Sequence, residues 1–189
     1  MLTTWVESRA VLGKGEFQVV KGLDEMSKSF PFRILGIHPD NGSEFINYHL
    51  YRYCQKNQIQ FTRSRPYKKD DNAHIEQKNW THVRKLFGWG RYDTQKAVDA
   101  MNDLYTNELR LFMNLFIPSM KIEKKIRIGS KMRKIYGSPK TPLERVIESG
   151  KADPDKLAAL IKLRDSLDPL ALSKINDQKI IRIHCGILE

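Results

Sequence analysis

The spacing of apolar and polar residues predicts alternating strands and helices in the first part of the chain. Apolar runs rich in β-branched and aromatic residues predict strands over Thr3–Leu12, Arg33–Ile37 and Gln58–Arg63. Between them, apolar residues recur at spacings of three and four, which predicts helices over Glu16–Ser29 and Ser43–Asn57. This order of elements is that of an open α/β sheet.

Two longer helices are expected next. The helix over Asn72–Phe87 carries one apolar stripe, and Glu76 lies at the start of that stripe. The stripe continues through Trp80, Val83 and Phe87. A second, strongly apolar helix starts at Asp93 or Thr94, reaches Ile117 and ends before Pro118, so we expect it to pack in the core.

The last third of the chain contains three helix starts. Thr141-Pro142-Leu143-Glu144 is a capping box with Pro at the first helical position, and Asp153-Pro154 and Asp168-Pro169 are starts of a similar type. We therefore expect a small helical appendage within residues 119–189, joined to residues 1–118 by a basic linker. The final stretch, Lys179–Glu189, matches no motif.

Composition narrows the class of protein. The chain has 189 residues, which suffices for one domain with a core and a small appendage. No apolar run reaches the length of about 18 residues that spans a membrane, and Met1–Glu7 lack the pattern of a signal peptide. Two cysteines provide no disulfide framework, so we expect a cytoplasmic protein.

The charge predicts a polyanionic partner. The net charge is +11 and the pI is about 9.6, which favours nucleic acid over a membrane surface. The stretch from Lys121 to Arg145 contains nine basic and two acidic residues, and the stretch from Phe61 to Lys96 contains nine basic and four acidic residues. The candidate DNA contacts in the first cluster are Lys124, Lys125, Arg127 and Lys131. The alternative for this cluster is a solvated surface that keeps the protein soluble.

Two carboxylates are candidates for chemistry. Asp40 follows an apolar strand and precedes the turn dipeptide Asn41-Gly42, which places it at the carboxyl end of the strand, where ligands of α/β sheets bind. A plain turn or cap residue is the alternative. Glu76 begins an apolar stripe, which favours metal ligation, with an ion pair to Lys or Arg as the alternative.

A polar loop over Ser64–Asp71 separates these carboxylates. Loops on a rigid scaffold often carry function, although this loop can also be an ordinary surface segment. The basic residues that could meet phosphates here are Arg63, Arg65, Lys68 and Lys69. On the helix that follows, Gln77 and Asn79 lie on faces other than that of Glu76 and could touch DNA.

Taken together, these residues resemble a known family. Two motifs carry the resemblance: Asp40-Asn41-Gly42-x-x-Phe45, and Glu76 at the start of a helix. Thirty-five residues separate Asp40 from Glu76. This pattern is similar to that of DDE integrases and transposases. The motif sequences most resemble those of bacterial insertion-sequence transposases with an integrase-type core. Arg63-Ser64-Arg65-Pro66-Tyr67 and Glu76-Gln77-Lys78-Asn79-Trp80-Thr81 resemble the flanking motifs of that subgroup. The resemblance runs from about Thr3 to about Pro169.

The resemblance implies a ribonuclease H-like fold in residues 1–118 and strand transfer by in-line phosphoryl transfer. Asp40 and Glu76 would be the second and third carboxylates, each binding one of two Mg²⁺ (or Mn²⁺) ions about 3.5–4 Å apart. We therefore expect their carboxyl groups to converge. The expected partners are transposon ends and target DNA, bound by a multimer, which implies a cytoplasmic, nucleoid-associated protein.

The first family carboxylate has no counterpart in this chain. There is no Asp before Asp24, which falls in a predicted helix, and Glu7 lies in a strand that matches a different one in the family. The resemblance therefore implies an N-terminally truncated core, with Thr3–Leu12 detached from the strand that ends at Asp40. Three hypotheses follow: an active recombinase with an upstream Asp, a DNA-binding remnant without catalysis, or a basic binding protein such as a repressor.

Overall fold

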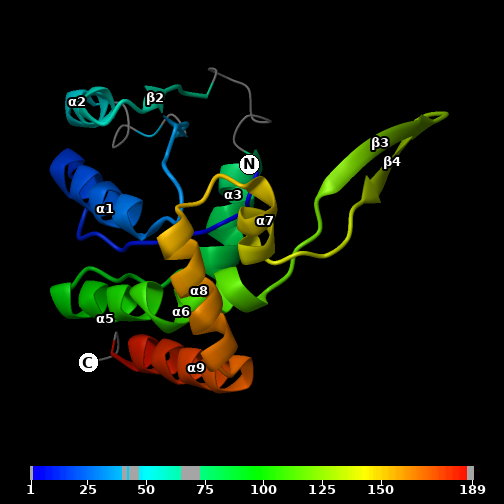
Figure 1. The fold of residues 1–189 in the computed structure, drawn as a ribbon. Coiled ribbons are helices and arrows are strands. Elements are labelled where there is room, and N and C mark those ends of the chain that lie inside the picture. The colour runs from blue at the N-terminus through cyan, green and yellow to red at the C-terminus, as the bar shows by residue number, and fades with distance from the viewer. Residues whose placement is uncertain (1, 40–41, 43–46, 65–72, 187–189) are drawn as a thin grey trace.

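The computed structural model describes residues 2–39, 42, 47–64 and 73–186 and shows a mixed α/β chain (Figure 1). In chain order, the elements are α1 (Glu16–Ser29), β1 (Gly36–Ile37), α2 (Tyr48–Lys56), β2 (Gln60–Phe61), α3 (Ala73–Asn79), the π-helical turn η2 (Trp80–Arg84), α4 (Lys85–Phe87), α5 (Gln95–Thr106), α6 (Glu108–Leu111), the π-helical turn η3 (Phe112–Phe116), β3 (Ile122–Ile128), β4 (Lys131–Tyr136), α7 (Pro142–Ser149), α8 (Pro154–Ser166) and α9 (Pro169–Cys185).

The early elements confirm part of the sequence prediction. Helix α1 has the predicted bounds. Strands β1 and β2 are shorter than predicted and pair in parallel, Gly36 with Gln60 and Ile37 with Phe61. The prediction that α2 begins at Ser43 is wrong, because Asn47 is extended (φ −138°, ψ 163°) and caps the helix by accepting a hydrogen bond from the Leu50 N–H at 2.7 Å.

The strand predicted over Thr3–Leu12 does not form, and that prediction is wrong. The Val6 N–H instead donates to Asn114 Oδ1 at 2.9 Å, and the Val6 carbonyl accepts from Asn114 Nδ2 at 2.7 Å. Asn102 makes the same pair of bonds to Ala10, at 2.8 and 3.0 Å. Each amide side chain donates through its N–H group and accepts through its carbonyl oxygen, as the backbone of a neighbouring strand would. Among the described residues, this segment does not pair with β1, but because it is not a strand the expectation of a detached strand stays untested.

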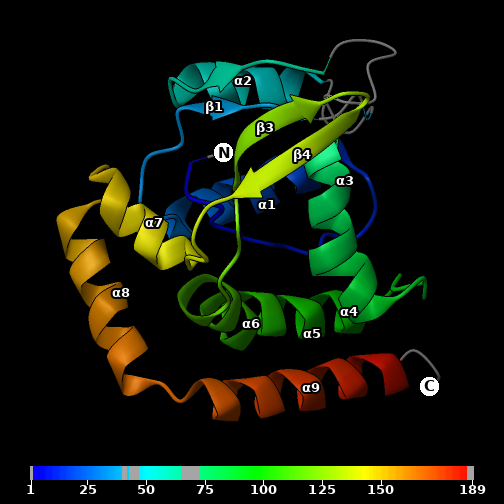
Figure 2. The same ribbon diagram turned by 90° about the vertical axis from the view of Figure 1, so that its right-hand side faces the viewer.

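Helix α3 continues through η2 into α4, so the run predicted to end at Phe87 is confirmed from Ala73 onward. The placement of Glu76 at the edge of a buried face is wrong. Glu76 is exposed and Trp80 is 56% exposed, whereas Phe87 at the other end of the stripe is 1% exposed. Figure 2 gives the reason: α3 rises above the layer formed by α4, α5 and α6, so only the carboxyl end of the run enters the core.

The predicted long helix to Ile117 is divided into α5, α6 and η3 by a break at Asn107 (φ −103°, ψ −102°). Its side chains supply two apolar clusters. The first contains Phe87, Met101, Leu104, Tyr105, Leu109 and Ile183. The second contains Trp5, Leu115, Leu143, Val146 and Leu160. Each cluster therefore joins residues from both sides of position 118.

The three predicted helix starts near the C-terminus are confirmed. Helix α7 begins at Pro142 with a complete capping box between Thr141 and Glu144, and α8 and α9 begin at Pro154 and Pro169 after Asp caps. Helix α9 lies along α5 and α6 in Figures 1 and 2 and extends to Cys185, so most of the stretch without a motif is helical. Within the described ranges, no helix is long and apolar enough to cross a membrane.

Candidate nucleic-acid interface

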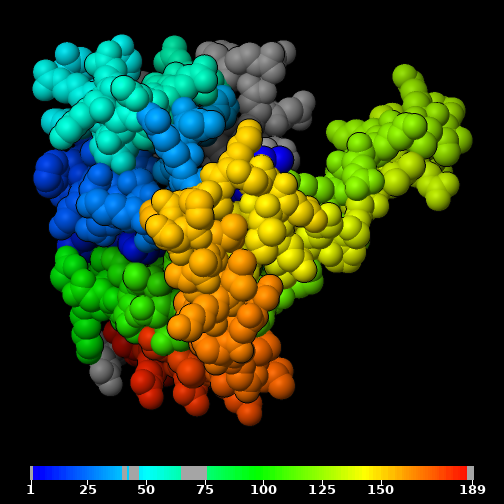
Figure 3. Space-filling model, in the orientation of Figure 1, coloured from blue at the N-terminus to red at the C-terminus, as the bar shows by residue number. Residues whose placement is uncertain are grey.

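The basic stretch after Pro118 forms an antiparallel hairpin, which the sequence prediction missed. Strands β3 and β4 are joined by a turn at Gly129 and Ser130, and Gly129 has a φ of +61°, which favours glycine. Two β-rich runs around a Gly-Ser pair are a hairpin signal that could have been recognised. Figure 3 shows that the hairpin projects well beyond the body of the molecule.

The pairing register places positive charge on both faces of the hairpin. Lys125 pairs with Lys134, and this pair shares a face with Arg127. The opposite face carries Lys131, which pairs with Ile128, and Arg133, which pairs with Ile126. Like charges directly opposite one another destabilise a strand pair, so the Lys125–Lys134 pair is unfavourable unless an anion approaches it.

All four DNA contacts predicted in this segment are exposed on the hairpin: Lys124, Lys125, Arg127 and Lys131. Arg127 donates to the carbonyl of Gly129 at 3.2 Å. Within the described part of the chain, none of the four forms an ion pair with a carboxylate. A two-stranded ribbon fits the major groove of DNA, and long basic side chains reach the phosphates on either side.

Arg145 of α7 holds the root of this hairpin, and the sequence analysis gave it no role. The residue is 7% exposed. Its Nη1 donates to the Lys140 carbonyl at 2.8 Å and to Ser119 Oγ at 2.9 Å, and its Nη2 donates to the Ser119 carbonyl. Nη1 also donates to Thr4 Oγ1 at 3.0 Å. Arg145 therefore ties both ends of the hairpin to the N-terminal segment.

The predicted metal ligands are only partly described by the structure. Asp40 lies outside the described residues, so its convergence with Glu76 stays a prediction. The segment before Asp40 is bonded to the segment after β2. The His38 ring shares a hydrogen bond of 2.9 Å with Thr62 Oγ1, and Ser64 Oγ donates to the Pro39 carbonyl at 3.4 Å. Strand β1 runs toward the side of the molecule on which α3 begins (Figure 2). Among the described residues, no group of three or more metal-binding side chains occurs.

Four acidic residues, Glu7, Glu16, Asp24 and Glu25, precede Asp40, and the sequence analysis considered Glu7 and Asp24 as substitutes for the first family carboxylate. Glu7, whose side chain is 0% exposed, accepts from Arg110 Nε at 2.7 Å and from Trp5 Nε1 at 2.8 Å. Asp24 pairs with Lys28 at 2.7 Å on α1. The Glu7 carboxylate is therefore closed to a metal ion in this arrangement, whereas Asp24 forms an exposed surface pair.

The remaining predicted DNA contacts fall into two groups. Arg63 at the end of β2 is exposed, and Gln77 and Asn79 are exposed on α3. The loop residues Arg65, Lys68 and Lys69 lie outside the described residues. The described members of the set are therefore accessible, but they are separate from the hairpin in the fold.

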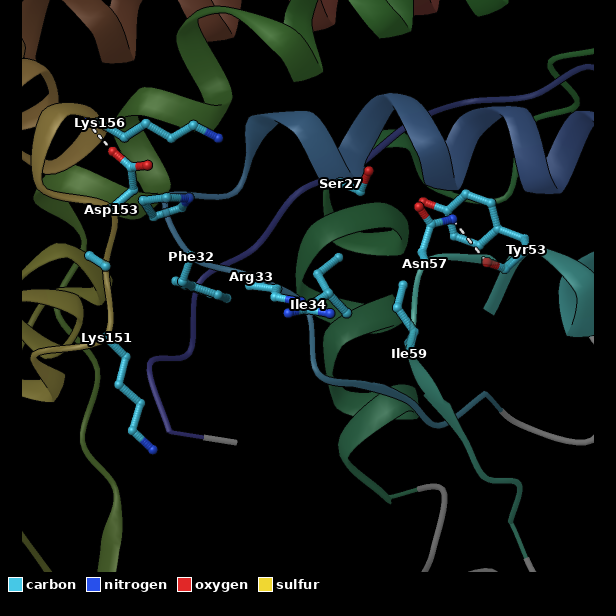
Figure 4. Close-up of a pocket in the computed structure, with 12 residues that line it drawn as sticks. Ser27, Phe32, Arg33, Ile34, Tyr53, Asn57, Ile59, Lys151, Asp153 and Lys156 are labelled. Carbon is cyan, nitrogen blue, oxygen red and sulfur yellow. Dashed lines mark hydrogen bonds between the residues drawn. The ribbon is translucent and has the colours of Figure 1, made fainter. Parts of the chain in front are cut away.

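A cavity of about 550 Å³ lies between the end of α1, α2 and the loop before α8 (Figure 4). Phe32, Ile34 and Ile59 line it, together with the basic side chains of Arg33 and Lys151. None of the residues predicted to bind DNA or metal lines this cavity. We therefore assign it no part in the site.

Comparison with known proteins leaves the function open. No family model matches the chain. It is 38% identical over 143 residues to a protein of Sinorhizobium fredii named "Uncharacterized protein y4rM". The match covers 76% of this chain but 41% of that relative, so the chain spans less than half of the relative's length.

Proposed function

We propose that this chain is the DNA-holding part of an integrase-type transposase core, and that by itself it binds DNA without cutting it. The observation that carries the proposal is the projecting β3–β4 hairpin, whose basic residues are exposed on both faces. Phosphate contacts of this kind provide affinity and position but little sequence preference. The location that follows is cytoplasmic and nucleoid-associated.

The catalytic part of the proposal rests on Asp40 and Glu76. In the resembled family, these two carboxylates bind Mg²⁺ or Mn²⁺ ions that stabilise the attacking and leaving oxygens of the phosphoryl transfer. Glu7 is buried and bonded to Arg110, and Asp24 lies on the predicted and observed helix α1, so we propose that the first family carboxylate is supplied from outside this stretch. A longer protein such as the matched relative has room for one, and the activity of such a protein is part of the proposal.

A second function, a basic nucleic-acid-binding protein derived from a transposase, is favoured by the burial of Glu7 in its ion pair with Arg110. Both functions predict binding to DNA, and they differ in the chemistry of Asp40. If the chain is a pure binding protein, neither Asp40 nor Glu76 affects any property other than stability.

The DNA-binding proposal is tested by fluorescence anisotropy with a labelled duplex over a series of KCl concentrations. Each phosphate contact contributes about −0.9 to the slope of log K against log salt. Changing Lys124, Lys125, Arg127 and Lys131 together to Gln should make the slope shallower by roughly 2 to 4. The matched control changes four exposed basic residues outside the hairpin to Gln, namely Lys96, Lys162, Lys174 and Arg182.

The control variant carries the same loss of net charge, so it separates local contact from general electrostatic attraction. If both variants lowered the slope equally, the hairpin would have no special role. Binding by the unaltered chain that did not respond to salt would reduce the basic hairpin to a solubilising surface.

The catalytic proposal is tested by a strand-transfer assay of the 189-residue chain with Mg²⁺ or Mn²⁺. We expect no product, because two of three carboxylates do not position both ions. Strand transfer that is lost on Asp40→Asn would contradict this expectation and would mean that another residue of this chain supplies the first carboxylate.

A further inference from the structure

Trp89 lies in the loop that follows α4, and it is strongly exposed for an aromatic residue. The side chain is 78% exposed, more than any other large apolar side chain of the described residues. Gly88 and Gly90 flank it, so no side chain of a neighbour in the sequence covers the ring. In Figure 2 this loop lies at the outer edge of the molecule. A ring of this size contributes substantial binding energy when a partner covers it.

Arg84 of η2 holds one face of this ring. Its guanidinium carbon lies over the Trp89 ring, 4.2 Å from the ring centre, which is a cation–π contact. Arg84 Nη1 also donates to the Gly88 carbonyl at 3.4 Å. Among the described residues, Trp89 contacts no second aromatic ring. Because the ring is so exposed, the face opposite Arg84 is open to solvent while the guanidinium fixes its orientation.

A second exposed tryptophan lies beside Arg84. Trp80 is 56% exposed and precedes Arg84 by four residues in η2, which places the two side chains at neighbouring positions on one helix face. The stretch Trp80–Arg91 contains three Arg or Lys residues and no acidic residue. Arg91 is paired with Asp93 at 2.8 Å, whereas Arg84 and Lys85 form no ion pair with a carboxylate of the described chain. The surface therefore combines flat rings with positive charge.

This combination fits an unpaired nucleic-acid strand. The bases of a duplex stack on one another and present only their edges, whereas a base of an unpaired strand has a face that can stack on an aromatic ring. Arginine and lysine beside such a ring attract the phosphates of the same strand. A second copy of this chain is a poorer occupant, because each copy carries a net charge of +11.

We propose that Trp89, held by Arg84, stacks on one base of an unpaired DNA strand, and that Trp80 offers a second ring on the same side. Lys85 contacts a neighbouring phosphate. This inference rests on the proposed DNA binding and names the form of DNA that the helical run carrying Glu76 binds, which is DNA with unpaired bases. The sequence analysis placed Trp80 in an apolar stripe and gave Trp89 no role.

The test is Trp89→Ala in the full chain, with Tyr48→Ala as the matched control. Tyr48 on α2 is also exposed and has the Arg52 guanidinium 4.3 Å from its ring centre, but its ring already stacks on Tyr51 at 6.5 Å. The probe is a fluorescein-labelled oligothymidylate, which does not pair with itself, followed by anisotropy. Trp89→Ala should weaken this binding roughly tenfold, whereas the control should bind like wild type. Equal affinities of Trp89→Ala and wild type, or an equal loss in the control, would overturn the proposal.

The salt dependence separates stacking from charge. Trp89→Ala removes a ring and no charge, so the slope of log K against log salt should stay that of wild type. Binding of a fully paired duplex should also be unchanged, and Trp89→Phe should retain most of the affinity for the oligothymidylate. A shallower slope in Trp89→Ala, or an equal loss of duplex binding, would overturn the proposal, because the ring would then act on DNA binding in general.

Two measurements without DNA test the other roles of this ring. Trp89→Ala should unfold at nearly the temperature of wild type, because an exposed ring adds little to the core. A clearly lower unfolding temperature would overturn the proposal and make Trp89 a structural residue. Light scattering should give the same molar mass for both proteins. A smaller mass for Trp89→Ala would show that a second copy covers the ring, and that result would also overturn the proposal.

The two proposals fail separately. If the quadruple hairpin variant retains wild-type duplex binding while Trp89→Ala still loses affinity for the oligothymidylate, the proposed function of the hairpin fails and the stacking site remains. If the hairpin variant behaves as expected while Trp89→Ala binds the oligothymidylate like wild type, the proposed function stands and the stacking site is refuted.

Discussion

Asn114 replaces a missing strand partner, and its removal should be costly. Asn114 is 1% exposed on η3. Its amide bonds both backbone groups of Val6, at 2.9 and 2.7 Å, and also donates to the Arg110 carbonyl at 3.0 Å. In Asn114→Ala, the Val6 N–H and C=O lose their partners in a half-buried segment.

The size of the effect follows from these three bonds. An unsatisfied buried polar group costs about 1–3 kcal/mol, and two such groups in a half-buried segment give a loss of about 3 kcal/mol in the free energy of unfolding. For a chain of this length, that loss lowers the unfolding temperature by about 10 °C. Asn102→Ala is the matched control, because Asn102 makes the same pair of bonds to Ala10. Asn102 is less buried, so water can replace its amide and the cost should be about 1 kcal/mol.

The measurement is urea unfolding of wild type and the two variants, followed by circular dichroism. The Asn114 variant should unfold at a clearly lower urea concentration than the Asn102 variant, with equal slopes of free energy against urea. Equal stabilities of the two variants, or a loss below about 1 kcal/mol in Asn114→Ala, would refute the idea that this buried amide replaces a strand.

Three further predictions concern other described residues. Folding buries His82 and lowers its pKa from about 6.5 to about 4, so the unfolded chain binds a proton more readily. The free energy of unfolding should therefore fall by about 2 kcal/mol as the pH falls from about 6.5 to 4, and His82→Gln should flatten this dependence in thermal unfolding. Arg110→Met should lower the free energy of unfolding by about 3–5 kcal/mol in urea unfolding, because it leaves the buried Glu7 carboxylate without its cation. Lys28→Met breaks an exposed pair and is the control; a smaller loss in Arg110→Met than in this control would contradict the prediction. Thr141→Ala should cost about 1 kcal/mol, whereas Thr141→Ser should retain the cap.

The sequence alone determined the features that depend on neighbouring residues. The starts of α7, α8 and α9 were predictable because a cap and a proline satisfy and preset the first helical turn within a few residues. Helix α1 was predictable for a related reason, since its apolar stripe and Pro31 lie within one short segment. The basic cluster and its four candidate DNA contacts could also be read directly from the chain.

Features that depend on distant residues were decided by the tertiary structure. Thr3–Leu12 has the composition of a strand, but Asn102 and Asn114, about a hundred residues away, take its hydrogen bonds. Glu76 begins an apolar stripe in the sequence, yet it is exposed because α3 rises above the core. The ribonuclease H-like topology and the approach of Asp40 to Glu76 remain predictions of the resemblance.

The hairpin shows both contributions. Its charge and its Gly-Ser turn can be recognised in the sequence. The position of the charged strands on the molecule depends on Arg145, which bonds both ends of the hairpin and holds them against α7 and the N-terminal segment. Charge is a property of single residues, whereas its position relative to a second surface depends on contacts between residues far apart in the chain. That is why the sequence predicted a polyanionic partner, while only the fold placed part of this charge on a projecting hairpin that Arg145 holds at its root.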